Sequence, residues 1–280
     1  MINTTIQFNH LTYQYDTQET LIFDDLTLSI HTDWKCALVA RNGRGKSTLL
    51  KLIAKKLQVT DGQVKTVDEC GYFPLNISDP SLYPAALFDI ESEDRWKVER
   101  EMRQFHLHPD KWWQPFEQLS GGEQVKVMLA VLFSQLFDYI VLYEPTIYLD
   151  ATTRHLIHDY LKQKKTGFLI VSHDRTFLEG LVDHVVGIEA HSADVIQGGY
   201  QQYYEEKANK DRYYTQQNAK IKQAIKRLQQ SAEEKSQWSS QKEKEKWGNP
   251  HVKKSKNHLD KGFLGARAAR IMKRVRHMER

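Results

Sequence analysis

The segment ARNGRGKST at residues 40–48 carries the strongest chemical signal in the sequence. A phosphate-holding loop needs glycines for close backbone approach, a lysine for the terminal phosphates, a hydroxyl for Mg²⁺ and a helix N-terminus facing the anion. These groups stand between a buried strand and a helix, at Asn42, Gly43, Arg44, Gly45, Lys46, Ser47 and Thr48. Ser47 is the predicted magnesium ligand. Ala40 replaces the first glycine of the pattern, at a cost of about 1 kcal/mol if its backbone needs a positive φ.

A second glycine-rich segment, LSGGEQ, occupies residues 119–124. Paired glycines at a helix start form an anion site. Together with the phosphate loop, this segment resembles the signature of the ATP-binding cassette (ABC) superfamily. The resemblance implies that it closes over the γ-phosphate of ATP held by a facing cassette. The implied nucleotide contacts are Ser120, Gly121, Gly122 and Glu123.

The segment FDYIVLYEPTIYLD at 137–150 matches the Walker B strand and D-loop of the same superfamily. This match implies that Glu144 is the general base that orients the attacking water, and that Asp150 is the D-loop aspartate. The segment VSHDRTFL matches the switch and places His173 at the γ-phosphate. Tyr15 lies where the family stacks an aromatic ring on adenine, with a core tyrosine as the alternative.

Three departures from the family pattern fall in the catalytic set. Tyr143 replaces the Walker B aspartate, Leu75 replaces the Q-loop glutamine, and Ile147 and Tyr148 replace a usual Asn-His pair. Losing an outer-shell carboxylate weakens metal binding or activity about 10–100-fold, and a phenol with a pKa of about 10 cannot supply that charge. We therefore expect nucleotide binding with impaired hydrolysis, in either a decaying gene or a specialised site that binds ATP as a clamp.

Strand-like and helix-like segments alternate around these motifs. Strands are predicted near residue 6 and at 26–30, 35–40, 139–143, 167–172 and 184–189, and helices at 46–57, 121–135, 151–163 and 175–182. This alternation predicts an α/β fold with a mostly parallel sheet covered on both faces. With the motifs, it indicates a P-loop nucleoside triphosphatase ABC nucleotide-binding domain over 1–204. Residues 76–135 form a helical subdomain that carries the signature motif.

The composition changes sharply after residue 204. Residues 205–280 hold 21 Lys and Arg against 9 Asp and Glu, whereas residues 1–204 hold 19 against 27. Apolar seams from Ile221 to Ala232 and from Leu264 to Met278 have heptad-type spacing, with a Gly/Pro breaker between them. They predict a C-terminal antiparallel helical hairpin with an incomplete second arm. A basic tail on an acidic body suggests a polyanionic partner.

The tail also carries a more specific resemblance. Tyr200, Tyr203 and Tyr204 leading into a charged helix, and KGFLGARAARIMKR at 261–274, resemble the linker of ABC-F proteins. That family places its linker beside the tRNA at the ribosomal peptidyl site, and some members confer antibiotic resistance. The resemblance implies ATP and Mg²⁺ as cofactors and the ribosome (rRNA and tRNA) as a partner through the basic hairpin. A second cassette, by homodimerisation or in trans, must complete the site, because Lys46 and Ser120 act from different cassettes.

Two other functions remain open at the level of the sequence: a non-enzymatic RNA- or ribosome-binding fragment of a degenerate gene, and the ATPase subunit of an ABC transporter. No run of about 18 apolar residues predicts a membrane span, and MINTTIQFNH does not resemble a signal peptide. Cys36 and Cys70 lack the spacing of metal ligands. We expect a cytoplasmic protein without a membrane partner.

Overall fold

A computed structural model describes residues 5–17, 20–90, 93–147, 149–189 and 192–247, with side chains as far as residue 234. The chain divides into two compact units, Met1–Tyr204 and Glu205–Arg280. The described strands all lie in the first unit. The predicted second arm, 264–278, and its breaker lie outside the described residues.

The first unit is built on a sheet of six strands. These are β3 (Lys35–Ala40), β5 (Cys70–Phe73), β6 (Tyr139–Tyr143), β7 (Phe168–Val171), β8 (His184–Ile188) and β9 (Ala193–Gln197). The order is β5-β6-β7-β3-β8-β9, in which only β9 pairs antiparallel. All residues of β7 and β8 are buried, as continuous apolar runs predict for parallel strands covered on both faces. The predicted α/β class is confirmed.

A second, antiparallel sheet has the order β2-β1-β4. Its strands are β1 (Thr5–Tyr13), β2 (Phe23–His31) and β4 (Asp61–Lys65). Strand β2 alternates buried and exposed residues, and Ile30 and Leu28 pair with Ile6 and Phe8 of β1. One face of this sheet therefore belongs to the core.

Helix α1 (Lys46–Ile53) packs in an apolar cluster with both sheets. Its buried Leu49, Leu50, Leu52 and Ile53 share this cluster with Ile6 and Ile30 of the small sheet and with Val141 and Leu169 of the large one. Truncating one such leucine to alanine costs about 2–5 kcal/mol. This packing fixes the helix whose N-terminus ends the phosphate loop.

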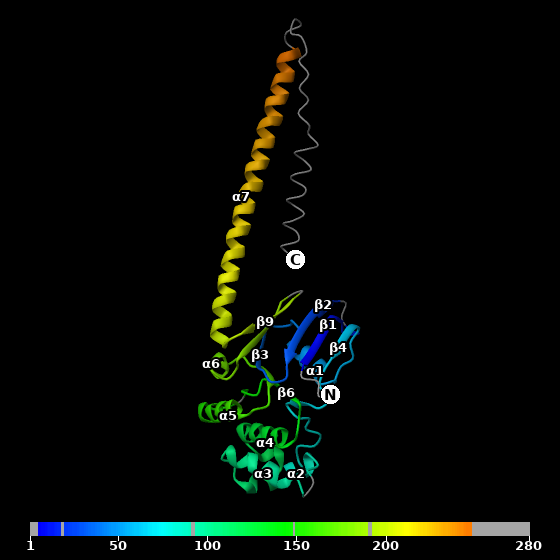
Figure 1. The fold of residues 1–280 in the computed structure, drawn as a ribbon, viewed down its shortest axis with the longest axis vertical. Coiled ribbons are helices and arrows are strands. Elements are labelled where there is room, and N and C mark those ends of the chain that lie inside the picture. The colour runs from blue at the N-terminus through cyan, green and yellow to red at the C-terminus, as the bar shows by residue number, and fades with distance from the viewer. Residues whose placement is uncertain (1–4, 18–19, 91–92, 148, 190–191, 248–280) are drawn as a thin grey trace. The chain divides into compact units, whose positions relative to one another are not determined.

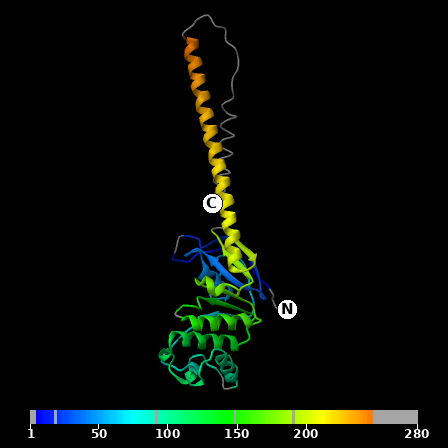
Figure 2. The same ribbon diagram turned by 90° about the vertical axis from the view of Figure 1, so that its left-hand side faces the viewer.

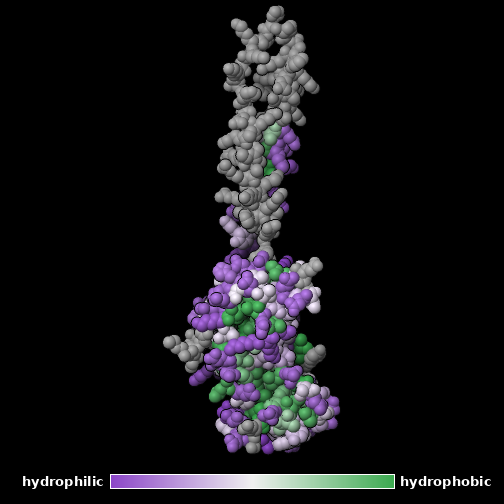
Figure 3. Space-filling model, turned by 90° about the vertical axis from the view of Figure 1, so that its right-hand side faces the viewer, coloured by the Kyte–Doolittle hydropathy of each residue, from purple (hydrophilic) through white to green (hydrophobic). Residues whose placement is uncertain are grey.

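The other face of the large sheet is covered by α4 (Gly121–Ser134) and α5 (Ala151–Gln163), and α3 (Arg95–Gln104) packs on α4. All three helices share a second apolar cluster with β6 and β7. Helix α4 is buried almost all round, as expected of a helix that is apolar on every side. Short helix α2 (Pro84–Leu87) and 3₁₀ turns at Pro109–Trp113 and Phe116–Gln118 complete the helical region. Figures 1 and 2 agree in placing α2, α3 and α4 together at one end of the unit. Figure 3 shows green hydrophobic residues interrupted by hydrophilic ones on that end.

Several boundaries differ from the sequence prediction. Helix α1 ends at Ile53 instead of residue 57, and α6 (Arg175–Leu178) stops four residues before the predicted end. Strands β4, β5 and β9 were not predicted. They are short, and β4 and β9 carry charged residues and contain only exposed and half-buried positions, which gives them a weak local signal.

Helix α7 (Tyr200–Trp247) confirms that the predicted first arm is helical, but it begins five residues before 205. Its first turn is anchored on β8. A Cβ atom on Gly187 would lie 2.4 Å from the hydroxyl of Tyr203, so only glycine admits this tyrosine. Tyr200 and Tyr203 are themselves buried.

Candidate nucleotide-binding site

The phosphate loop leaves the carboxyl end of β3 and ends at the first turn of α1. Gly43 and Gly45 have φ values of 78° and 81°, a region that glycine enters without penalty. A Cβ atom on Gly45 would lie 2.6 Å from side-chain atoms of both Ile22 and Phe23. No side chain caps α1, so the backbone N–H groups of its first turn remain available to an anion.

Lys46 lies over this loop. Its Nζ donates hydrogen bonds to the carbonyl of Ala40 at 3.0 Å and to Oδ1 of Asn42 at 3.3 Å. Ala40 is not among the described residues with positive φ. The conditional cost of replacing glycine there is therefore not incurred, and the loop keeps its shape with alanine.

Tyr15 is tied to the same turn of α1. Its hydroxyl lies 3.0 Å from Oγ1 of Thr48, and its ring meets Tyr13 edge-on at 5.1 Å between centroids. Tyr15 is half-buried at the rim of the apolar cluster, and Ser47 is half-buried beside Thr48. Tyr15 thus packs as a rim residue while lying next to the phosphate loop.

Glu144 follows β6 and lies beside His173, which follows β7. Oε2 of Glu144 accepts a hydrogen bond from the His173 N–H at 3.2 Å. Oε1 lies 3.4 Å from Nε2 of His173, a charge pair only when the imidazole is protonated. Oε1 is buried and accepts no hydrogen bond from the described residues. Such an acceptor suits a water molecule that a general base must orient.

The backbone of Glu144 is constrained. Its φ is 50°, which costs a residue other than glycine on the order of 1–3 kcal/mol. The N–H of Glu144 donates to the carbonyl of Val171 at 2.8 Å, and the hydroxyls of Thr146 and Ser172 are 2.8 Å apart. These contacts tie together the chain segments that follow β6 and β7.

The position of the Walker B aspartate is held by Tyr143. This residue ends β6, is half-buried, and packs on the α1 side with Tyr15 and Tyr72. Leu75 packs against the opposite apolar cluster. Among the described residues, no three His, Cys, Asp or Glu side chains gather as a metal site. The groups around Ser47 therefore fit a phosphate chain. They fit a firmly held magnesium ion poorly, because they offer the Ser47 hydroxyl without the outer-shell carboxylate that the family has at position 143.

The signature segment forms the capped start of α4. Ser120 Oγ accepts a hydrogen bond from the Glu123 N–H at 3.3 Å, and Glu123 Oε2 accepts from the Ser120 N–H at 2.9 Å. Burial raises the pKa of Glu123, but the hydrogen bonds from Ser120 and Lys111 outweigh it and lower the pKa. This is a capping box, which the Ser-x-x-Glu spacing signals and the sequence reasoning overlooked. Gly121 and Gly122 form the first turn of the helix.

Asp150 caps α5. Its Oδ1 accepts a hydrogen bond from the Thr153 N–H at 2.7 Å, and this bond lowers the pKa of Asp150. Arg154 of the same helix pairs with Asp174 of the switch at 3.0 Å. Asp150 therefore has a structural role within this chain. Its contact with a facing cassette remains a prediction.

The phosphate loop, Glu144 and His173 follow three adjacent parallel strands, because β7 lies between β3 and β6. Ligands of open α/β sheets bind at this carboxyl edge. The signature residues begin a different element, α4, in the helical end (Figure 1). The structure thus brings the phosphate loop, Glu144 and His173 to one edge of the sheet and places the LSGGEQ segment on a separate element.

Comparison with known proteins identifies the domain. Residues 23–147 match the family model described as "ABC transporter". The chain is 31% identical over 201 residues to the erythromycin resistance ATP-binding protein MsrA of Staphylococcus epidermidis, covering 71% of this chain and 38% of that protein. It is 32% identical over 166 residues to the ribosome protection protein VmlR of Bacillus subtilis, covering 58% and 30%. The chain spans about a third of the length of the curated relatives that it matches.

Among solved structures, the dimeric cassette MJ0796 bound to ADP and Pi matches with a TM-score of 0.60 at 20% identity, covering 69% of this chain and 98% of that one. The first unit therefore has the α/β fold of ABC nucleotide-binding domains, which is a P-loop nucleoside triphosphatase fold. Within the described ranges, none of the helices combines the length and hydropathy of a membrane span.

Proposed function

We propose that this chain is an ABC-F-type protein that binds ATP and acts on the ribosome, in translation or in antibiotic protection, with impaired hydrolysis. The observation that carries the nucleotide part is the uncapped N-terminus of α1 beneath two glycines in the left-handed conformation and Lys46. Backbone N–H groups and one ammonium there can cradle the phosphates of ATP. The predicted nucleotide contacts at 42–48 all lie in this loop or the first turn of α1.

Ribosome action is supported by the charge of the second unit and by the names of two relatives. Residues 205–280 carry a net charge of +12 by the counts of Lys, Arg, Asp and Glu, which favours binding to polyanions such as rRNA and tRNA. MsrA and VmlR are named for erythromycin resistance and ribosome protection. A ribosomal partner implies a cytoplasmic location.

A second cassette is part of the proposal. Ser120 caps the start of α4, which is a different element from the phosphate loop. The resemblance to ABC cassettes implies that Ser120 covers a nucleotide held by a facing copy. MJ0796 is described as a dimer. We propose that Lys46 of one cassette and Ser120 of another enclose one ATP, either in a homodimer or with a cassette supplied in trans.

We infer impaired hydrolysis from the residues that replace the family's catalytic carboxylate and amide. Glu144 has a buried oxygen without a hydrogen-bond donor among the described residues and a neighbouring His173, which supports their proposed roles as general base and switch. Tyr143 and Leu75 supply neither a carboxylate nor an amide. Loss of one outer-shell carboxylate alone predicts about 10–100-fold weaker activity or metal binding.

Ribosome co-sedimentation tests this function. Wild type should pellet with ribosomes more with ATP than without it, and the Lys46→Ala variant should lose that difference. Lys65→Ala removes an equal charge from the exposed end of β4 and should behave as wild type. Binding should fall steeply with salt, as expected when phosphates dominate. Equal pelleting of Lys46→Ala and wild type in both conditions would leave RNA binding by a non-enzymatic fragment as the better reading.

An ABC transporter subunit is the second candidate. It is favoured by the family model and by solved structures, including an Atm1-family exporter with ATP bound, at a TM-score of 0.63 and 15% identity. That likeness concerns the fold. Recovery of the protein with membranes instead of ribosomes would select this candidate.

A further inference from the structure

Three tyrosine rings lie near the carboxyl end of β6, on the side of the sheet that packs against α1. Tyr15, Tyr72 and Tyr143, here called the tyrosine cluster, are half-buried against the apolar cluster that contains α1. Tyr72 of β5 pairs with Val141, so Tyr143 lies two residues further along β6 on the same face. The pKa of Tyr72 is raised by burial and then by Tyr143 and Tyr15, as expected when three phenols lie close together.

The tyrosine cluster reaches the first turn of α1, which carries Ser47, the predicted magnesium ligand. The Tyr15 hydroxyl lies 3.0 Å from Thr48 Oγ1, one residue after Ser47. The neighbouring acid, Glu144, has one oxygen hydrogen-bonded to the His173 N–H and the other beside the imidazole. Tyr143 thus stands at the position where the resemblance to ABC cassettes implies an aspartate.

The loop itself is rich in positive charge. Arg41 and Arg44 are exposed in it, and Lys46 follows two residues later. A cation beside a triphosphate is needed chiefly to offset the repulsion of the phosphate oxygens. Three basic side chains within six residues, with no acidic residue among them, offset part of that charge without a metal.

We propose that this site binds a nucleoside triphosphate with an affinity that does not depend on a divalent cation. The inference rests on the proposed nucleotide binding and specifies its chemistry. Ser47 retains its hydroxyl, but Tyr143 holds the position from which the resemblance implies a supporting carboxylate. One oxygen of Glu144 is bound to the His173 N–H. Binding energy then comes from the loop N–H groups, Lys46 and the arginines.

Titration of the purified full chain with a fluorescent ATP analogue, in excess magnesium and in EDTA, tests the inference. The two dissociation constants should differ by less than about tenfold, the lower bound expected when a metal-supporting group matters. Loss of more than this in EDTA would overturn the inference while leaving nucleotide binding intact. Absence of saturable binding in both solutions would overturn the proposed function as well.

Two variants at one position sharpen the test. Tyr143→Asp restores a carboxylate and should bind the analogue at least about tenfold more tightly with magnesium than with EDTA. Tyr143→Asn leaves the same space without the charge and should stay independent of magnesium. Equal magnesium dependence in the two variants would overturn the inference. Thermal unfolding establishes that both fold, and the wild-type ratio decides the matter without either variant.

Discussion

The guanidinium carbon of Arg175 lies 4.8 Å from the ring centre of Tyr204. Arg175 comes two residues after the switch residue His173, and Tyr204 is in the first turns of α7. Glu179 Oε2 also accepts a hydrogen bond from the Gln201 N–H at 3.2 Å. The switch segment, in which the resemblance places His173 at the γ-phosphate, is therefore in direct contact with the first turns of α7.

This contact predicts that α7 responds to nucleotide through Arg175. In wild type, ATP should change amide hydrogen exchange in the first turns of α7, and Arg175→Ala should reduce that change. Arg175→Lys keeps a cation over the ring and should retain most of it. The cation–π contact itself contributes only about 0.5–1 kcal/mol, so both variants should fold. An unaltered response in Arg175→Ala would contradict the contact's role.

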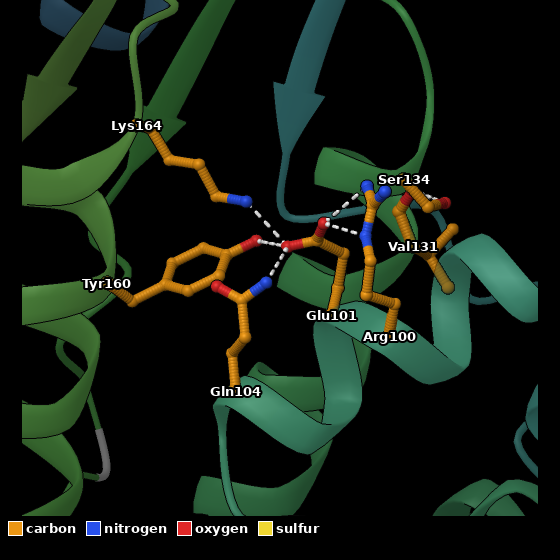
Figure 4. Close-up of polar contacts among 7 residues, drawn as sticks. All are labelled: Arg100, Glu101, Gln104, Val131, Ser134, Tyr160 and Lys164. Carbon is orange, nitrogen blue, oxygen red and sulfur yellow. Dashed lines mark hydrogen bonds and ion pairs between the residues drawn. The ribbon is translucent and has the colours of Figure 1, made fainter.

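Glu101 predicts a pH-dependent contribution to stability. Figure 4 shows this buried carboxylate of α3 between Tyr160 and Lys164 on one side and Arg100 on the other. It accepts hydrogen bonds from Tyr160 Oη at 2.6 Å and Lys164 Nζ at 2.5 Å. Burial raises the pKa of Glu101, but the bonds from Lys164 and Tyr160 outweigh it, and the pKa is lowered below 4.5.

A lowered pKa means that the carboxylate stabilises the fold fully above its unfolded pKa, and that this stabilisation is lost as pH falls through the folded value. Glu101→Gln should therefore lower the free energy of unfolding by about 1.5–3 kcal/mol at pH 7. The difference from wild type should shrink as pH falls below 4.5. Denaturant unfolding at several pH values measures it. Glu99→Gln, which breaks the partly exposed Arg95 pair on the same helix, should cost at most about 0.5 kcal/mol.

The two loop glycines should respond differently to alanine. At Gly43 a Cβ atom would meet nothing within 4 Å, so Gly43→Ala should cost about 1 kcal/mol for the backbone conformation alone. Gly45→Ala adds the collision with Ile22 and Phe23 and should shift α1 or unfold its first turn. Thermal unfolding and ATP titration compare the two variants. Equal effects would contradict the tight approach at Gly45.

The capping box at Ser120 separates a structural from a functional contribution. Ser120→Ala should cost about 1 kcal/mol of stability. Ser120→Asp keeps a capping oxygen but brings a negative charge toward a facing nucleotide and toward Glu123, whose Oε2 lies 2.9 Å from the Ser120 hydroxyl. If Ser120 covers ATP in a second cassette, Ser120→Asp should remain folded, as thermal unfolding checks, yet fail to form ATP-dependent dimers. Analytical ultracentrifugation in a Glu144→Gln background provides the measurement. Dimers in Ser120→Asp would argue against the composite site.

Local patterns predicted the parts of the fold whose signal lies within a few residues. The apolar runs of β6, β7 and β8 and the glycine spacing of the phosphate loop are such signals. Strand β4 was not predicted because its pairing, such as Val64 with Phe8, depends on distant sequence, and most of its own residues are polar. The Glu101–Lys164 contact joins residues 63 apart in the chain, and the fit of Tyr203 on Gly187 joins two separate elements.

In the site, the resemblance to a family singled out Glu144 and His173, and the structure shows that they follow the neighbouring strands β6 and β7. The capping box of Ser120 and Glu123 was overlooked although its spacing is a local signal. The Tyr15–Thr48 contact has no local signal, because it depends on how β1 and α1 are packed. The lack of a hydrogen-bond donor for the buried Oε1 of Glu144 within the described part of the chain likewise could not be predicted, because it depends on how distant segments pack.

The most direct test of the account is equilibrium binding of labelled ATP to the folded chain, with wild type, Lys46→Ala and the control Lys65→Ala compared. We predict saturable binding by wild type and Lys65→Ala, and a loss of affinity of at least about tenfold for Lys46→Ala, as one charge-assisted contact is worth. Failure of folded wild type to bind ATP, or equal binding by Lys46→Ala, would contradict the claim that the loop around Lys46 holds a triphosphate.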